Sequence, residues 1–137
     1  MANKILTVVD ASVLIYAATK PTSATFARRA RSLQVLTDPD REFVATEYLQ
    51  LEVVPIAKYF SKTKEILFYE KFFAAVQHWV DTETLIKPAY SLACQYGLGA
   101  MDALHVVAAA LVNAEFVSAE KPTKPIYRAY SNITSVY

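Results

Sequence analysis

Four acidic residues lie beside strongly apolar segments of this chain. Acidic side chains are seldom buried unless they are paired, protonated or bound to a metal ion. Four of them in such settings predict a divalent-cation site, and therefore chemistry on a phosphate group. The four are Asp10 after residues 5–9, Glu52 within residues 48–54, Asp102 before residues 103–112, and Glu120 after residues 116–119.

Carboxylate oxygens favour hard cations such as Mg²⁺ or Mn²⁺. A cation of this kind polarises a phosphoryl oxygen and lowers the pKa of bound water, which supplies a nucleophile at neutral pH. Zinc is disfavoured because His78, His105 and Cys94 show no zinc-ligand spacing. His105 lies one turn after Asp102, and we expect it to be a core histidine rather than a ligand.

Each acidic residue also has a simpler interpretation, which the sequence leaves open. Asp10 could be a turn residue, Glu52 an exposed helix residue, Asp102 a helix cap and Glu120 a loop residue. Ser12 is expected to cap the helix that follows it, or to place its hydroxyl beside a metal ion or phosphate.

Other phosphate chemistries lack their motifs. Gly97 and Gly99 are the two glycines of the chain, which excludes a P-loop and a dinucleotide-binding fingerprint. No G-x-S-x-G elbow is present for a hydrolase serine. The segment Asp10-Ala11-Ser12 has no second aspartate two residues after the first, which argues against an aspartyl-phosphate phosphatase.

Length and composition predict one globular domain over residues 1–137. The chain is 54% hydrophobic, enough for a core without disulfides, and has a net charge of +1. Its single cysteine, Cys94, lies in an apolar stretch and is expected to be a buried thiol. No signal peptide or spanning segment is evident, so we expect a soluble cytoplasmic protein without membrane contact.

Apolar runs and turn residues predict an α/β fold with a mainly parallel sheet of about five strands. In such sheets ligands gather beyond the carboxyl ends of the strands, where Asp10 and Glu120 lie. Strands are predicted at residues 5–9, 42–45, 84–86, 115–118 and 133–137. Helices are predicted at residues 13–18, 24–37, from 46 through 52, from 61 or 63 to 79, 88–97 and 100–112.

The order of these motifs resembles that of PIN-domain ribonucleases. Residues 8–15, VVDASVLI, look like the opening of that family, and residues 97–105, GLGAMDALH, look like its third motif. Glu52 matches the second acidic position. Residues 116–120 resemble a strand that usually ends in Thr-x-Asp, although this chain has Ser118 and Glu120 at those positions.

The resemblance implies a three-layer α/β/α sandwich and Mg²⁺- or Mn²⁺-dependent endonucleolytic cleavage of RNA, leaving 5′-phosphate and 3′-hydroxyl ends. A compact PIN domain of this size is most similar to VapC-type toxins of toxin–antitoxin systems, which usually form homodimers and are neutralised by a small antitoxin. Asp10 and Asp102 would bind the metal, and Glu52 and Glu120 would complete the catalytic set. The substrate would be held by Ser12, Arg28, Arg29, Lys121 and Lys124.

Three interpretations remain open at this stage. The first is the toxin nuclease. The second is a PIN-like binding module with weakened catalysis, which Glu120 would permit because its longer side chain moves the charge by about one methylene relative to the usual aspartate. The third is a PIN nuclease that acts in RNA processing. The basic clusters could also be no more than solvated helix faces and loops.

Overall fold

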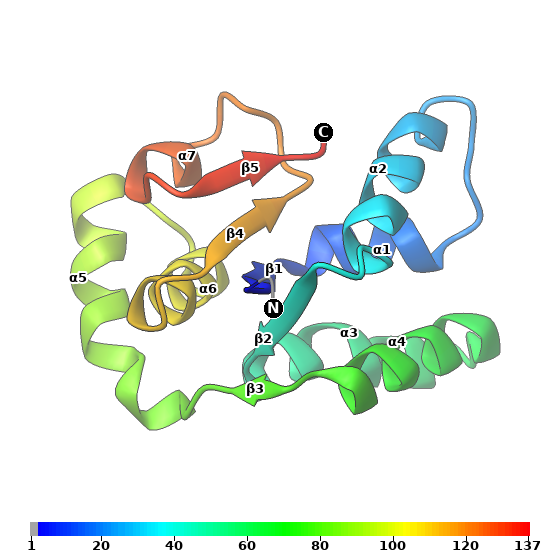
Figure 1. The fold of residues 1–137 in the computed structure, drawn as a ribbon, viewed down its shortest axis with the longest axis horizontal. Coiled ribbons are helices and arrows are strands. Elements are labelled where there is room, and N and C mark those ends of the chain that lie inside the picture. Colours follow the sequence, from blue (N-terminus) through cyan, green and yellow to red (C-terminus); the bar gives the residue numbers. More distant parts are fainter. Residues whose placement is uncertain (1–2) are drawn as a thin grey trace.

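The computed structural model describes residues 3–137 and has a five-stranded sheet at its centre (Figure 1). All of its strand pairs are parallel, as predicted, and the strand order is β3-β2-β1-β4-β5. β1 is therefore the central strand, and Asp10 directly follows its carboxyl end. The strands are β1 Ile5–Val9, β2 Arg41–Ala45, β3 His78–Trp79, β4 Glu115–Ser118 and β5 Ile133–Ser135.

Helices cover both faces of the sheet because successive strand residues point to opposite sides. Val9, Ala45 and Val117 belong to a core built with one group of helices, and their neighbours Val8, Val44 and Phe116 to a core on the other face. The first group is α1 Ala11–Ala18, α2 Phe26–Leu36, α3 Glu47–Tyr59 and α4 Thr63–Ala75. The second is α5 Ile86–Tyr96, α6 Ala100–Leu111 and α7 Ile126–Ala129. This confirms the predicted three-layer α/β/α sandwich.

Helix α6 is the most deeply buried helix of the second layer. Residues 103–109 are all buried, as expected for a helix that is apolar on nearly every side. The chain leaves it through Asn113, which adopts a left-handed conformation with φ 55°, a geometry that asparagine tolerates better than most residues. Asp102 lies in the first turn of α6, directly before these buried residues.

The third strand differs from the prediction. Residues 84–86 are not a strand; Thr82–Thr84 form a 3-10 turn, and α5 begins at Ile86. The predicted helix ending at residue 79 ends instead at Ala75, and His78–Trp79 form β3. The physical reason is pairing with β2, in which Gln77 and Val80 donate backbone hydrogen bonds to β2 on either side of β3.

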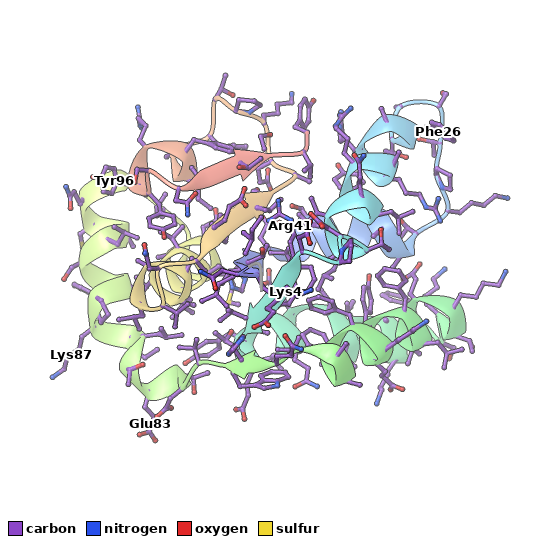
Figure 2. All side chains as sticks on the ribbon, viewed as in Figure 1. Lys4, Phe26, Arg41, Glu83, Lys87 and Tyr96 are labelled. Carbon is purple, nitrogen blue, oxygen red and sulfur yellow. The ribbon has the colours of Figure 1, made fainter. Side chains whose placement is uncertain are left out.

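Several charged residues and Cys94 differ in how far they lie from the molecular surface. Arg41, at the start of β2, lies near the middle of the molecule, whereas Glu83 and Lys87 project outward near the start of α5 (Figure 2). Cys94 is exposed, which corrects the expectation of a buried thiol, because α5 packs on α6 through other residues, among them Ala89 and Leu92. Among residues 3–137, no helix has the length and apolar character needed to cross a bilayer.

Candidate active site

Asp10 is a buried carboxylate held by four surrounding groups. It caps α1 by accepting a hydrogen bond from the backbone N–H of Val13 at 3.3 Å, so Asp10, and not Ser12 as predicted, is the cap. Ser118 Oγ donates to Asp10 Oδ2 at 2.5 Å, and Ser12 Oγ donates to Oδ1. Burial raises the pKa of Asp10, and the hydrogen bonds from Ser118 and Ser12 and the charge of His105 partly oppose that rise.

Ser12 has a bridging role rather than a capping one. Its hydroxyl donates to Asp10 and accepts the backbone N–H of Ala119 at 3.1 Å. It therefore links the end of β1 to the end of β4, the two strand ends that carry Asp10 and Glu120. The difference from the prediction has a local cause. Asp10 and Ser12 both have side chains that can cap a helix, and Asp10 is the one with the extended backbone that a capping residue requires.

Burial and the charges of all three other predicted carboxylates raise the pKa of Asp102. Partial burial raises its pKa first, followed by the negative charges of Asp10 and Glu120, with a smaller contribution from Glu52. His105 acts in the opposite direction. The negative charges of Asp10, Glu120 and Glu52 therefore all act on Asp102. Like charges repel each other, and a bound cation would relieve that repulsion.

Glu52 extends from α3 and forms a hydrogen bond with His105 of α6. His105 Nε2 lies 2.7 Å from Glu52 Oε1, and the histidine side chain is 3% exposed while the glutamate is 30% exposed. His105 is therefore a buried, satisfied histidine, as expected, but its partner was not foreseen. A polar side chain in the middle of an apolar helix was the available signal, because such a group needs a partner when buried.

Glu120 is positioned by its backbone. Its N–H donates to Ser118 Oγ at 3.1 Å, and its carbonyl accepts a hydrogen bond from the hydroxyl of Tyr127 at 2.6 Å. The carboxylate of Glu120 makes no hydrogen bond within residues 3–137, so it is available to a ligand. Ser118 contacts both Asp10 and Glu120, a connection that its position as a serine in place of the usual threonine did not by itself predict.

The donor set suits Mg²⁺ or Mn²⁺ better than any softer metal, because its donors near Asp102 are carboxylates. Within the described part of the chain, no three His, Cys, Asp or Glu side chains are arranged as a ready-made metal cage. Mg²⁺ does not require one, since it usually retains several waters and uses one or two protein carboxylates. Asp10 and Asp102 would supply those two, while Glu52 is engaged by His105.

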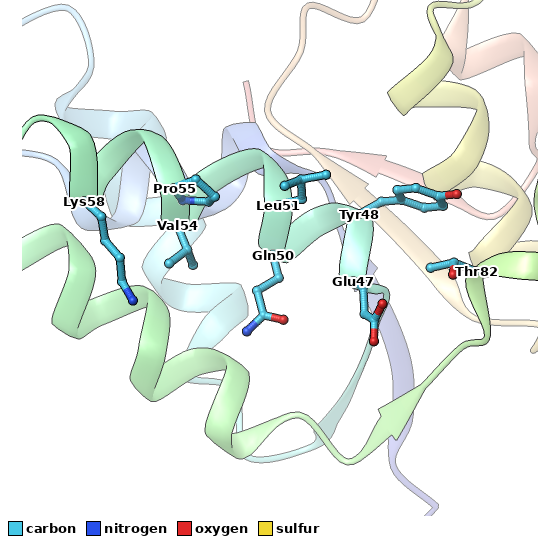
Figure 3. A pocket seen from close by; sticks show the side chains of 8 residues that line it. All are labelled: Glu47, Tyr48, Gln50, Leu51, Val54, Pro55, Lys58 and Thr82. Atoms are coloured by element: carbon cyan, nitrogen blue, oxygen red, sulfur yellow. The ribbon is translucent and has the colours of Figure 1, made fainter.

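The predicted substrate residues fall into two groups. Ser12, Arg28, Lys121 and Lys124 line one cavity beside Glu120, whereas Arg29 does not line it. A larger groove of about 530 Å³ runs along α3, and its lining includes Tyr48, Leu51 and Lys58 (Figure 3). That groove contains none of the four carboxylates, whereas the lining of the smaller cavity includes one of them, Glu120.

Comparison with known proteins places this chain in the PIN domain family, whose model matches residues 7–124; the chain belongs to that family. A toxin–antitoxin complex from Klebsiella pneumoniae contains a similar chain, with a TM-score of 0.73, 14% identity, and coverage of 96% of this chain and 98% of that one. A chain of VapBC2 from Rickettsia felis, bound to a DNA fragment from its promoter, is similar with a TM-score of 0.64 and 15% identity, and the match covers 96% of this chain and 98% of that one. A protein from Pyrobaculum aerophilum is similar with a TM-score of 0.66 and 13% identity, and the match covers 96% of this chain and 90% of that one. These likenesses show the fold, and no curated protein matches the sequence.

Proposed function

We propose that this PIN domain is a Mg²⁺- or Mn²⁺-dependent endoribonuclease and the toxin of a toxin–antitoxin pair. The observation that carries the nuclease proposal is that the ends of β1 and β4 meet, where Ser118 donates to the Asp10 carboxylate and accepts the backbone N–H of Glu120. Burial and the charges of these acidic residues and of Glu52 also raise the pKa of Asp102. Such mutual repulsion destabilises a fold unless a cation or another positive group offsets it. The membership in the PIN family gives the acidic cluster its nuclease interpretation.

Each residue has a defined part in the proposed reaction. Asp10 and Asp102 would hold the cation, and Ser12 and Ser118 fix the orientation of the Asp10 carboxylate. A divalent cation supplies polarisation of a phosphoryl oxygen and a more acidic water. Glu120, whose carboxylate is free of hydrogen bonds within residues 3–137, is placed to accept a proton or hold a water. His105 keeps Glu52 turned toward the cluster.

The toxin role and its partner draw on the structural neighbours. Two of them come from structures described as a toxin–antitoxin complex and as VapBC2, and the chain aligns over nearly its full length with both. We therefore propose a small antitoxin protein as partner, a homodimer as the assembly, and the cytoplasm, where RNA is available, as the location. A PIN nuclease in RNA processing is the alternative within the same chemistry.

A second candidate function is a PIN-like binding module with weakened catalysis. Two observations favour it: glutamate stands at position 120, and the Glu52 carboxylate is already engaged by His105. Under this alternative the domain would still bind RNA but would not cleave it. Cleavage in the presence of Mn²⁺ separates the two functions directly.

The test compares wild-type protein with Asp102→Asn in an RNA cleavage assay containing Mn²⁺. Asp40→Asn is the matched control, because Asp40 is exposed in the turn before the amino-terminal end of β2, whereas Asp10 follows the carboxyl end of the parallel strand β1. We expect cleavage by wild type and Asp40→Asn, and a loss of at least about a hundredfold in Asp102→Asn. Intact RNA with wild-type protein would contradict the nuclease proposal and favour the binding module.

Growth after induced expression tests the toxin role separately. Arrest with wild type and Asp40→Asn, but not with Asp102→Asn, supports it. If wild type cleaves RNA in vitro while cells grow normally, the RNA-processing alternative is favoured and the toxin role fails. Sedimentation of the purified chain reports the homodimer, and a monomer at micromolar concentration would contradict that part.

A further inference from the structure

A cavity of about 320 Å³ adjoins the acidic cluster and shares one of its residues, Glu120. Ser12 connects the two, since it donates to Asp10 on one side and lines the cavity on the other. Ligand sites usually have volumes of roughly 300–1,000 Å³, so this cavity has room for one nucleotide-sized group. Anything bound in it lies directly beside the carboxylates.

The cavity is positively charged. Arg28, Lys121 and Lys124 line it, against one acidic lining residue, Glu120. None of these three cations forms a salt bridge within residues 3–137, whereas Arg41 and Lys58 elsewhere are paired with acidic residues. Unpaired cations gathered on a concave surface raise the local concentration of an anionic ligand. The charge therefore favours an anion as the occupant.

Arg28 is held in position before any ligand binds. Its Nη1 donates to the hydroxyl of Tyr16 at 3.1 Å, and its guanidinium carbon lies 3.8 Å from the centre of the Tyr137 ring. Lys121 Nζ lies 6.0 Å from the centre of the same ring. A side chain that is already ordered loses less entropy on binding. Arginine presents five N–H donors in a planar fork, and most of those of Arg28 remain available.

We propose that this cavity binds an RNA backbone phosphate adjacent to the one that is cleaved. The proposal rests on the nuclease function above, and adds to it a defined subsite with Arg28 as its main donor. A guanidinium fork matches two phosphate oxygens at once, which a single ammonium group does not. Because the cavity lies beside Asp10 and Glu120, it would bind a second phosphate of the substrate on one side of the scissile bond.

The test measures binding of three small RNA probes, the dinucleotide UpU and its 5′- and 3′-phosphorylated forms pUpU and UpUp. Binding is measured with a chelator present, so that no cation contributes. We expect one of the two terminal phosphates to strengthen binding to wild type by about tenfold, the size of a charge-assisted hydrogen bond in a partly exposed site. Arg28→Gln should lose that gain, and Arg28→Lys should keep only part of it.

Two control variants remove a positive charge elsewhere. Arg128→Gln repeats the same chemical change on α7, on the other side of the sheet, at a residue that does not line the cavity. Lys87→Gln is the control for Lys121→Gln, because Lys87 projects from α5 away from the cavity (Figure 2). Both controls should keep the tenfold gain. If Arg28→Gln does not fold, as judged by circular dichroism, Lys121→Gln against Lys87→Gln gives the same test.

Three results would overturn the proposal: no gain from either terminal phosphate, an equal gain in Arg28→Gln, or binding of tetraglutamate as tight as that of the better phosphorylated dinucleotide. The last would indicate a site for acidic protein segments rather than RNA. Failure of the nuclease proposal is a different result, since it would show as absent Mn²⁺-dependent cleavage while the phosphate gain persists. Conversely, cleavage that depends on Asp102 with no phosphate gain would remove only the subsite.

Discussion

The hydrogen bond between Glu52 and His105 connects α3 to α6 and allows a quantitative prediction for His105→Leu. Leucine has a similar volume but no donor, so the change removes the 2.7 Å interaction and leaves the packing largely filled. Hydrogen bonds to charged groups contribute about 1.5–3 kcal/mol. Because the Glu52 side chain is 30% exposed and can turn toward water, we expect the lower end, about 1.5 kcal/mol of lost unfolding free energy.

Urea denaturation measures this loss. With an m-value of about 1–3 kcal/mol/M, a loss of 1.5 kcal/mol lowers the midpoint by about 0.5–1.5 M. Glu52→Gln is the companion variant: His105 still donates to the amide oxygen, so the loss should stay below about 1 kcal/mol. In the double variant the two losses should not add, because one interaction connects both residues.

The same variant tests whether the hydrogen bond from His105 positions Glu52 for catalysis. His105→Leu should lower RNA cleavage even at urea concentrations where the protein is fully folded, because Glu52 is no longer held toward Asp102. A midpoint unchanged within about 0.2 M, together with unchanged cleavage, would refute this reasoning. It would mean that the contact contributes neither stability nor position.

Two further predictions concern pH and charge. Burial and the neighbouring carboxylates raise the pKa of Asp102, so its protonated form is favoured by folding; in chelator the wild type should gain stability relative to Asp102→Asn as the pH falls from 7 to 4. At pH 7 Asp102→Asn should be more stable than wild type by about 0.5–1 kcal/mol, and a lower stability, measured by urea denaturation, would contradict the repulsion. For Glu115, burial alone would raise the pKa, but hydrogen bonds from Thr134 and Arg41 outweigh it and lower the pKa. Its stabilisation is therefore present above the unfolded pKa and is lost as the pH falls through the folded one. Glu115→Gln should cost about 2 kcal/mol at pH 7, where Arg41 Nη1 lies 2.7 Å from Glu115 Oε1, and nearly nothing at pH 2–3; an equal cost at both pH values would argue against the ion pair.

The parts of the fold that could be predicted are those whose signal is local. Residues 5–9 and 115–118 are mainly apolar segments, and they form β1 and β4 as expected; residues 7–9 and 116–118 are buried. The apolar helix over residues 100–112 was predicted within one residue of its observed end at Leu111, since no other structure buries so many consecutive side chains.

The errors occur where the outcome depends on distant partners. A two-residue strand such as β3 has no periodicity of its own and exists only because β2 accepts its backbone hydrogen bonds. The exposure of Cys94 depends on which face of α5 meets α6. The acidic positions were predicted from their placement beside apolar segments, and the resemblance to PIN domains, confirmed by the family match, agreed with them. The contact between Glu52 and His105 joins residues 53 apart and has no local signature.

The central claim is that Asp10 and Asp102 hold a divalent cation, and calorimetric titration with Mn²⁺ tests it most directly. Wild type and Asp40→Asn should give a saturable binding heat, and Asp10→Asn should lose it, because the buried carboxylate supplies a ligand that an amide does not replace. Absence of a binding heat in wild type, or equal binding in Asp10→Asn, would contradict the claim.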